Sequence, residues 1–349
     1  MNLKKLKDST FNAYAVDLVL IIILIVAVIF AVCVGKYPVS PGESIRVLLC
    51  EVLGIDGTSL GTEYSEMTKN VVMGLRIPRI FANVLCGMAL AMSGTVYQGI
   101  FKNPLVSPDF LGVSSGACIG AAIAILLSLS GIALQGFAFL GGIIAVAVTV
   151  FIPKVMRSNS NIMLVLSGII VGGAMSSILG FIKYVADPAT ELAAITYWTM
   201  GSFSYVTIDN ILSILPTMVI PAIILMAISW WIDVMSLGES EAKTLGANIV
   251  LIRNIAIACA TLMTASSVCL SGTIGWVGLV IPHFARMIVG PSNTKLIPAS
   301  ALIGGIFMLL VDTATRTIGV AEMPVSILTG IIGAPFYAAL LYKQRKTIS

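Results

Sequence analysis

Two arginines form the most unusual pairing of residue types in the chain. Arg76 and Arg79 flank Ile77-Pro78, which places both cations on one face of a helix whose first turn suits Pro78. Cations at a helix N-terminus oppose the helix macrodipole, so the pair needs an acidic counterpart. Three counterparts remain open: lipid phosphates, the chain's own acidic loop, and carboxylates of a separate protein.

The residue types that most enzymes use in catalysis are scarce. The chain has one histidine, His283, beside Pro282, and no HExxH zinc motif. Asp312 has Arg316 at i+4, which favours a local ion pair over proton coupling through a buried acid. No GxxxxGK[ST] loop cradles phosphates, so any nucleotide hydrolysis must come from another subunit. These observations argue against an enzyme.

The uncharged gaps between charged residues predict the elements that hold these groups. With 58% hydrophobic and 10% charged residues among 349, the chain cannot be a soluble globular protein. A helix needs about 20 apolar residues to cross a bilayer core. The gaps lie at 18–35, 80–101, 110–153, 158–182, 210–232, 254–285, 296–311 and 323–342. Residues 110–153 and 254–285 are long enough for two spans each, which gives ten.

The positions of lysine and arginine predict the orientation. Threading ten spans from a cytoplasmic N-terminus leaves most of the 20 basic residues inside, including Lys4, Lys154 and Lys346. The competing interpretation adds residues 192–208 as an eleventh span, but their Thr, Tyr, Ser and Gly content suits an interfacial or re-entrant segment. We therefore expect an all-α integral membrane protein with ten transmembrane helices, several of them broken or short, and both termini cytoplasmic.

The predicted protein is a single transmembrane domain over 1–349 with two sizeable loops. The external loop, 36–70, repeats apolar residues at helical spacing and predicts a short surface helix. The cytoplasmic loop, 233–253, contains Glu239 and Lys243 as a favourable i,i+4 pair and Gly246 as a C-terminal cap. This second loop could be a docking element for an energy-supplying subunit or a plain connector.

Motifs in order along the chain resemble one family. They are Arg76-Ile77-Pro78-Arg79, Gly87 to Gly94 with Gln98, Asn103 to Pro108, Leu111-Gly112, Leu237 to Gly246, Gly275 to His283 with Arg286, Glu322-Met323-Pro324 and Gly333-Ala334-Pro335. Together, from about residue 40 to 342, they resemble the FecCD family of ABC-transporter permeases, which carry ferric siderophores, haem or cobalamin. The resemblance is specific for the family and not for the cargo.

The resemblance also implies partners and residue roles. It implies a cell-membrane permease paired with a second copy or a paralogue, two ABC ATPase subunits that hold ATP and Mg, an external substrate-binding protein, and no cofactor or metal in this chain. The implied roles are binding-protein docking for Arg76, Arg79 and Arg316; ATPase coupling for Leu237, Gly238, Glu239, Glu241, Ala242, Lys243, Leu245 and Gly246; a cytoplasmic gate for Asn103, Leu105, Asn161 and Ile162; and a structural signature for Pro282, His283 and Arg286.

The implied function is the import of an iron chelate driven by ATP hydrolysis on another subunit. A ferric siderophore is the first choice of cargo because it is the commonest in the family, with cobalamin or haem as alternatives. An ion-coupled secondary transporter that works without an ATPase is the alternative from a different class.

Overall fold

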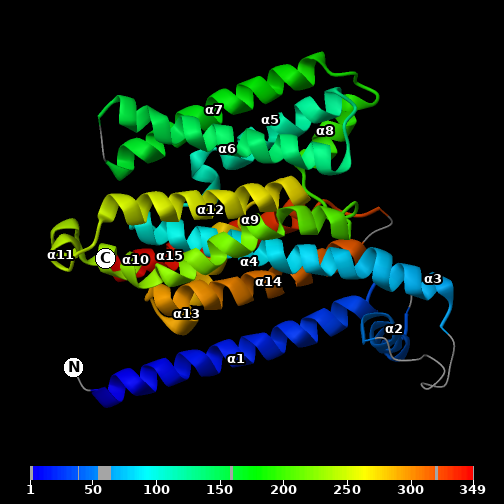
Figure 1. Ribbon diagram of the computed structural model, residues 1–349, viewed down its shortest axis with the longest axis horizontal. Coiled ribbons are helices and arrows are strands. Elements are labelled where there is room, and N and C mark those ends of the chain that lie inside the picture. Colours follow the sequence, from blue (N-terminus) through cyan, green and yellow to red (C-terminus); the bar gives the residue numbers. More distant parts are fainter. Residues whose placement is uncertain (1–2, 38, 54–63, 158–159, 319–320, 349) are drawn as a thin grey trace.

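The computed structural model describes residues 3–37, 39–53, 64–157, 160–318 and 321–348, and no strand occurs in these ranges (Figure 1). The elements are α1 (Leu3–Cys33), α2 (Pro41–Leu53), α3 (Glu66–Lys69), η2 (Asn70–Arg76), α4 (Ile77–Phe101), η3 (Pro108–Leu111), α5 (Val113–Leu126), α6 (Gly131–Val155), α7 (Asn161–Val185), α8 (Glu191–Thr199), α9 (Ile208–Ala227), α10 (Ser229–Leu237), α11 (Glu239–Thr244), α12 (Ile249–Ser271), α13 (Val277–Val289), α14 (Asn293–Thr317) and α15 (Val325–Ile348).

The helices follow the uncharged gaps. Among the described residues, seven helices are long and apolar enough to cross a membrane, and α5, α13 and residues 325–339 of α15 are shorter apolar helices. The gap at 110–153 holds α5 and α6, and the gap at 254–285 holds α12 and the first part of α13. The all-helical membrane fold with several short helices is therefore confirmed.

Left-handed backbone residues divide the two long gaps. Ser128 (φ 55°) and Gly131 (φ 57°) turn the chain between α5 and α6, and Gly272 (φ 71°) and Trp276 (φ 73°) turn it between α12 and α13. An α-helix cannot continue through such residues, so each gap becomes two helices.

Three further expectations concern short elements. Residues 192–199 belong to α8, which has nine residues, and residues 200–207 are not helical, so this segment is too short to be a span of its own. The predicted surface helix of the external loop is α2, and the predicted polar helix of the cytoplasmic loop is α11.

The arrangement has a distinct inner and outer end. α4 runs through the centre of the bundle between α12 and α14, α5 to α8 form a layer on one side, and α1 lies along the opposite side (Figure 1). One end of the bundle carries α2, α3 and α8, and the other carries α11 and both chain termini (Figure 1). We refer to them as the outer and inner ends, following the orientation that the basic residues predict.

Glycines allow close helix contacts, as in other membrane bundles. An added Cβ at Gly116 of α5 would lie 2.3 Å from the carbonyl oxygen of Gly141 on α6, and the reverse distance is the same. Gly120 and Gly168 also face neighbouring backbone carbonyls at about 2 Å, whereas Gly172 has nothing within 4 Å. Gly116, Gly120, Gly141 and Gly168 therefore pack closely against a neighbouring backbone, and Gly172 does not.

Gly116→Ala is expected to destabilise the protein by about 1–3 kcal/mol, because the new methyl group must push α5 and α6 apart. The matched control is Gly136→Ala on α6, where no atom lies within 4 Å of the added Cβ and the change is expected to be neutral or stabilising by up to about 1 kcal/mol. Thermal unfolding of the purified chain in detergent measures both. Equal midpoints for the two variants would contradict the close-packing interpretation.

Candidate functional site

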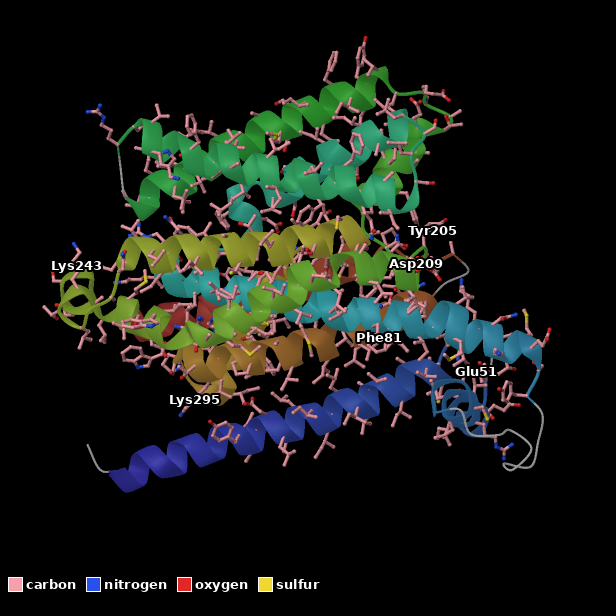
Figure 2. The ribbon with its side chains drawn as sticks, in the orientation of Figure 1. Glu51, Phe81, Tyr205, Asp209, Lys243 and Lys295 are labelled. Carbon is pink, nitrogen blue, oxygen red and sulfur yellow. The ribbon has the colours of Figure 1, made fainter. Side chains whose placement is uncertain are left out.

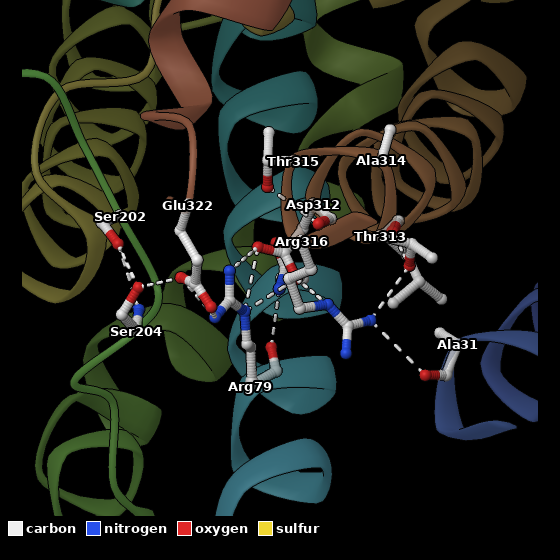
Figure 3. Close-up of polar contacts among 12 residues, drawn as sticks. Ala31, Arg79, Ser202, Ser204, Asp312, Thr313, Ala314, Thr315, Arg316 and Glu322 are labelled. Atoms are coloured by element: carbon white, nitrogen blue, oxygen red, sulfur yellow. Dashed lines mark hydrogen bonds and ion pairs between the residues drawn. The ribbon is translucent and has the colours of Figure 1, made fainter. Parts of the chain in front are cut away.

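An ion cluster of Arg79, Asp312, Arg316 and Glu322 lies at the outer end (Figure 3). Arg79, in the first turn of α4, donates from Nε and Nη2 to Asp312 at 2.8–3.1 Å and from Nη1 to both Glu322 oxygens at 3.0 Å. Arg316 follows Asp312 by one turn of α14, and its Nε lies 3.3 Å from Asp312 Oδ2. One buried carboxylate therefore holds two guanidinium groups.

Glu322 closes the cluster from the chain between α14 and α15. The hydroxyl of Ser204 donates to its Oε2, and Arg79 donates to both of its oxygens. Partial burial raises the pKa of Glu322, but these donors and the charge of Arg79 outweigh burial and lower the pKa below its ordinary value. Glu322 is therefore held as an ionised partner of Arg79.

Arg76 has a different set of partners. Its guanidinium donates to the backbone carbonyls of Val32, Cys33 and Tyr37, at and just beyond the end of α1. The last carbonyls of a helix lack partners within that helix and carry partial negative charge. Arg76 therefore caps α1. Residues 66–101 form one continuous helix through α3, η2 and α4, so Arg76 and Arg79 lie inside it, and the prediction that a helix begins at this pair is wrong.

These contacts show that the three arginines predicted to dock a binding protein already have partners within the chain. Arg76, Arg79 and Arg316 are only 4%, 8% and 6% exposed, and the carboxylates that meet Arg79 and Arg316 come from the chain itself. They come from α14 and residue 322, not from the external loop at 36–70. The sequence did contain this signal, since the Asp312–Arg316 ion pair was predicted from its i+4 spacing and is confirmed.

The three arginines also line a hollow at the outer end, which we call the outer hollow. It has a volume of about 250 Å³, and Lys36 and Glu322 line it as well. Four basic side chains and one acidic side chain thus face the same space among the described lining residues. The outer hollow carries net positive charge and suits an anionic group.

The coupling segment begins and ends with glycines in unusual conformations. Gly238 (φ 145°) separates α10 from α11, and Gly246 (φ 84°) follows α11. The Gly246 amide donates to Lys243 O at 3.0 Å and the Ala247 amide to Ala242 O at 2.9 Å, which is a Schellman motif. The C-terminal cap predicted at Gly246 is therefore present.

One side of α11 packs against α10, and the leucines at its two ends are exposed. Ala242 is fully buried in a small cluster with Val234 and Met235 of α10, whereas Leu237 and Leu245 are 65% and 54% exposed. Lys243 lies at the far end of the molecule from Glu51, Tyr205 and Asp209 (Figure 2). Glu241 and Gly238 belong to the same turn, while the side chain of Glu239, and with it the predicted Glu239–Lys243 pair, lies outside the described residues.

Two turns at the inner end contain the predicted gate residues. The Oδ1 of Asn103 accepts from the Leu105 amide at 2.9 Å, and the hydroxyl of Ser160 accepts from the Ile162 amide at the start of α7. Leu105 and Ile162 are exposed. Asn161 begins α7, but its side chain lies outside the described residues.

The signature residues on α13 tie this helix to α4. Arg286 Nη2 donates to Gln98 Oε1 at 3.1 Å, and Gln98 Nε2 donates back to the Leu279 carbonyl at 3.3 Å. Pro282 is buried and His283 is partly buried in the same helix. A structural role fits this arrangement.

A second hollow, which we call the α7 hollow, was not predicted from the sequence. It has a volume of about 450 Å³ between α7, η3 and the start of α13, and much of its wall is small: Ser115, Gly168, Gly172, Gly173, Ser176 and Gly275. Asp109 lies in this wall and accepts from the hydroxyls of Ser107 and Ser114. The signal that sequence reasoning missed is this single acid between Pro108 and α5.

One catalytic motif also escaped the sequence analysis. Gly112 to Gly116 matches the GxSxG pattern of serine hydrolases, whose serine normally sits on a turn between a strand and a helix. Here Ser114 lies in the first turn of α5, follows a 3-10 turn, and donates its hydroxyl to Asp109. This context does not fit a nucleophile.

Comparisons with known proteins identify membrane transport proteins as relatives of this chain. The model of the FecCD transport family matches residues 23–343. The molybdate import system permease protein MolB of Haemophilus influenzae is 35% identical over 327 residues, 94% of this chain and 95% of the relative. A probable iron chelatin transport system permease protein of Helicobacter pylori is 35% identical over 336 residues, 96% of this chain and 99% of the relative.

A solved structure shares the fold. It is described as an inward-facing conformation of a putative metal-chelate type ABC transporter, with a TM-score of 0.83, 33% identity, and coverage of 94% of this chain and 99% of that one. The family model and these relatives span nearly the whole chain. The chain therefore belongs to the FecCD transport family, as a multi-pass cell-membrane permease of an ABC importer.

Proposed function

We propose that this chain is the membrane subunit of an ATP-driven importer that receives a metal chelate from an external binding protein. The observation that carries the proposal is the contrast between the two ends of the bundle. The outer end presents a net positive hollow, and the inner end presents a short capped helix with exposed leucines. The chain has no phosphate-binding loop of its own.

The proposed topology has ten spans and both termini in the cytoplasm. The seven long apolar helices and the three shorter ones support the number. Both chain ends lie at the end that carries α11 (Figure 1), which an even number of spans requires. The helices α5 and α13 would be spans whose helical part is shorter than the bilayer core. Non-helical backbone at membrane depth is tolerated where it is covered by protein.

Two ABC ATPase subunits are the proposed partners at the inner end. They would hold ATP and Mg, and the permease itself would bind no cofactor. α11 would fit a groove on the ATPase with Leu237 and Leu245, while buried Ala242 fixes the helix to α10. Movement of the ATPase would thus reach α10, whose Asp233 accepts from the Asn293 amide at the start of α14.

The external substrate-binding protein is the proposed partner at the outer end. A carboxylate from it would enter the outer hollow among Arg76, Arg79 and Arg316. Since these arginines already have partners within the chain, the incoming group would add to an existing network. Such contacts would govern the docking rate and its salt dependence more than the affinity.

The proposed passage lies where a second copy, or a paralogue, covers α7. The outward face of α7 carries exposed apolar side chains such as Ile169, Ile170 and Phe181, and the α7 hollow opens beside them. Asn103, Leu105, Asn161 and Ile162 would narrow the inner end of this passage. Exposed apolar faces in membrane helices fit either lipid or a second subunit, and the hollow favours a subunit here.

An iron chelate is the proposed cargo, with a ferric siderophore as the first choice. The relative from Helicobacter pylori is named for an iron chelate, and other relatives are named for hemin, cobalamin or molybdate. Haem and cobalamin therefore remain alternatives of the same family, and molybdate joins them. A secondary transporter that uses an ion gradient is the alternative of a different class.

Reconstitution tests the proposal directly. Proteoliposomes that contain the permease and its ATPase, with binding protein outside, are expected to accumulate a labelled ferric siderophore when ATP is enclosed with the ATPase. A Walker-lysine variant of the ATPase is the control and is expected to abolish uptake. Accumulation by the chain alone on an ion gradient would instead establish the secondary transporter.

A further inference from the structure

The α7 hollow is lined almost entirely by uncharged groups. Its walls are mainly glycine, serine and apolar side chains, and Asp109 is the single ionisable residue among the described residues that line it. Asp109 is exposed to the hollow, at the end of the connection from α4 that also holds Asn103 and Leu105. The Asp109 carboxylate therefore lies on the same connection as the predicted gate residues Asn103 and Leu105.

Two hydroxyl groups orient the Asp109 carboxylate. Ser107 and Ser114 donate hydroxyl hydrogens to its two oxygens. Burial has the largest effect on this carboxyl and raises the pKa of Asp109 above its ordinary value, and the two donors oppose that rise only in part. No basic side chain occurs among the described residues that line the hollow. This differs from the outer hollow, where basic side chains outnumber acidic ones.

The size of the hollow determines how far this charge acts. A hollow of about 450 Å³ is roughly 8 Å across, which is about the Debye length at physiological salt. A cleft that has low-dielectric walls and charges of one sign raises the local concentration of ions of opposite charge and lowers that of ions of the same charge. Any cargo that fills the hollow therefore lies within the field of Asp109.

We propose that Asp109 sets the charge selectivity of the passage, so that neutral or positively charged metal chelates pass and oxyanions are disfavoured. The inference rests on the proposed function, in which the α7 hollow forms half of the passage. It narrows the cargo class in a way that the family does not. In a homodimer the second Asp109 would double the effect.

A charged-reagent assay measures the field without any cargo or ATPase. The full chain carries Ser176→Cys as a reporter in the wall of the hollow, and the partly exposed Cys33 and Cys50 are replaced by serine. Rates of modification by a cationic and an anionic methanethiosulfonate reagent are measured in proteoliposomes. Their ratio is normalised to the ratio for a small free thiol.

The expected normalised ratio favours the cationic reagent by about tenfold. Asp109→Asn is expected to bring the ratio close to one, Asp109→Glu to preserve it, and Asp209→Asn, a change of an exposed acid on α9, to leave it unaltered. A ratio that Asp109→Asn does not change would overturn the proposal. So would a thiol that neither reagent reaches at Ser176→Cys and at a second reporter, Ser115→Cys.

Uptake by the reconstituted complex separates this inference from the proposed function. If no cargo enters with ATP, the proposed function fails, whatever the reagent ratio. If wild-type complex imports molybdate as readily as a neutral ferric siderophore, when each is supplied with a binding protein that delivers it, the function holds and the selectivity inference fails. Asp109→Asn is expected to raise relative molybdate uptake severalfold.

Discussion

Asp312→Ala is expected to lower the free energy of unfolding by about 3–5 kcal/mol, the usual cost of removing one partner from a buried ion pair. The Asp312 side chain is fully buried and lies between Arg79 and Arg316, which are themselves nearly buried. Without the carboxylate, two guanidinium groups would be left with Glu322 as their remaining acidic partner in the cluster. A loss of this size is a large part of the stability of a typical domain.

Two variants separate this electrostatic effect from a general loss of packing. Asp312→Ala combined with Arg316→Met removes one cation with the anion and is expected to recover part of the stability. Asp209→Ala removes an exposed carboxylate and is expected to change stability little. The measurements are the yield of folded chain and the thermal midpoint in detergent. A wild-type midpoint for Asp312→Ala would mean that the cluster does not stabilise the fold.

The ion cluster also changes how docking has to be tested. Arg79→Glu would place a third carboxylate beside Asp312 and Glu322, so the variant would fail by repulsion whether or not a partner docks there. Reversal of acidic residues on the binding protein avoids this problem. Reduced docking rates that lose their salt dependence would then support a carboxylate in the outer hollow.

The fold was largely predictable from the spacing of charges. Helices in a bilayer must satisfy their backbone internally and must be long and apolar, so the uncharged gaps marked the spans. The gap at 110–153 was too long for one helix, and its division into α5 and α6 followed from that length. Two other signals placed short helices in the polar loops: apolar residues at helical spacing for α2, and an i,i+4 charge pair with a glycine cap for α11.

The partners of the arginines were less predictable. Spacing along one helix revealed Asp312 and Arg316, but Arg79 lies 233 residues from Asp312 and 243 from Glu322. Only the packing of α4 against α14 brings these groups together. Asp109 was missed for a similar reason. It lines a hollow whose other walls come from α7 and α13, and the sequence around Asp109 does not show that these helices lie nearby.

Loss of the exposed leucines beside α11 is expected to weaken the complex with the ATPase by at least about 100-fold. Burying one leucine side chain contributes about 1.5–3 kcal/mol, and each 1.4 kcal/mol is about tenfold in affinity. Leu237→Ser with Leu245→Ser removes two such side chains from the inner end of the molecule. Both are exposed in the free chain, so its folding is expected to remain intact.

Co-purification with the ATPase measures this loss, and thermal unfolding of the free permease checks that the fold is kept. The control is Ile22→Ser with Ile25→Ser on α1, where the side chains are similarly exposed but lie on the far side of the bundle, away from α11. If the leucine variant still binds the ATPase and supports uptake, α11 is a connector. If binding is lost while Gly246 still caps a folded α11, the exposed leucines are the contact through which ATP hydrolysis drives the permease.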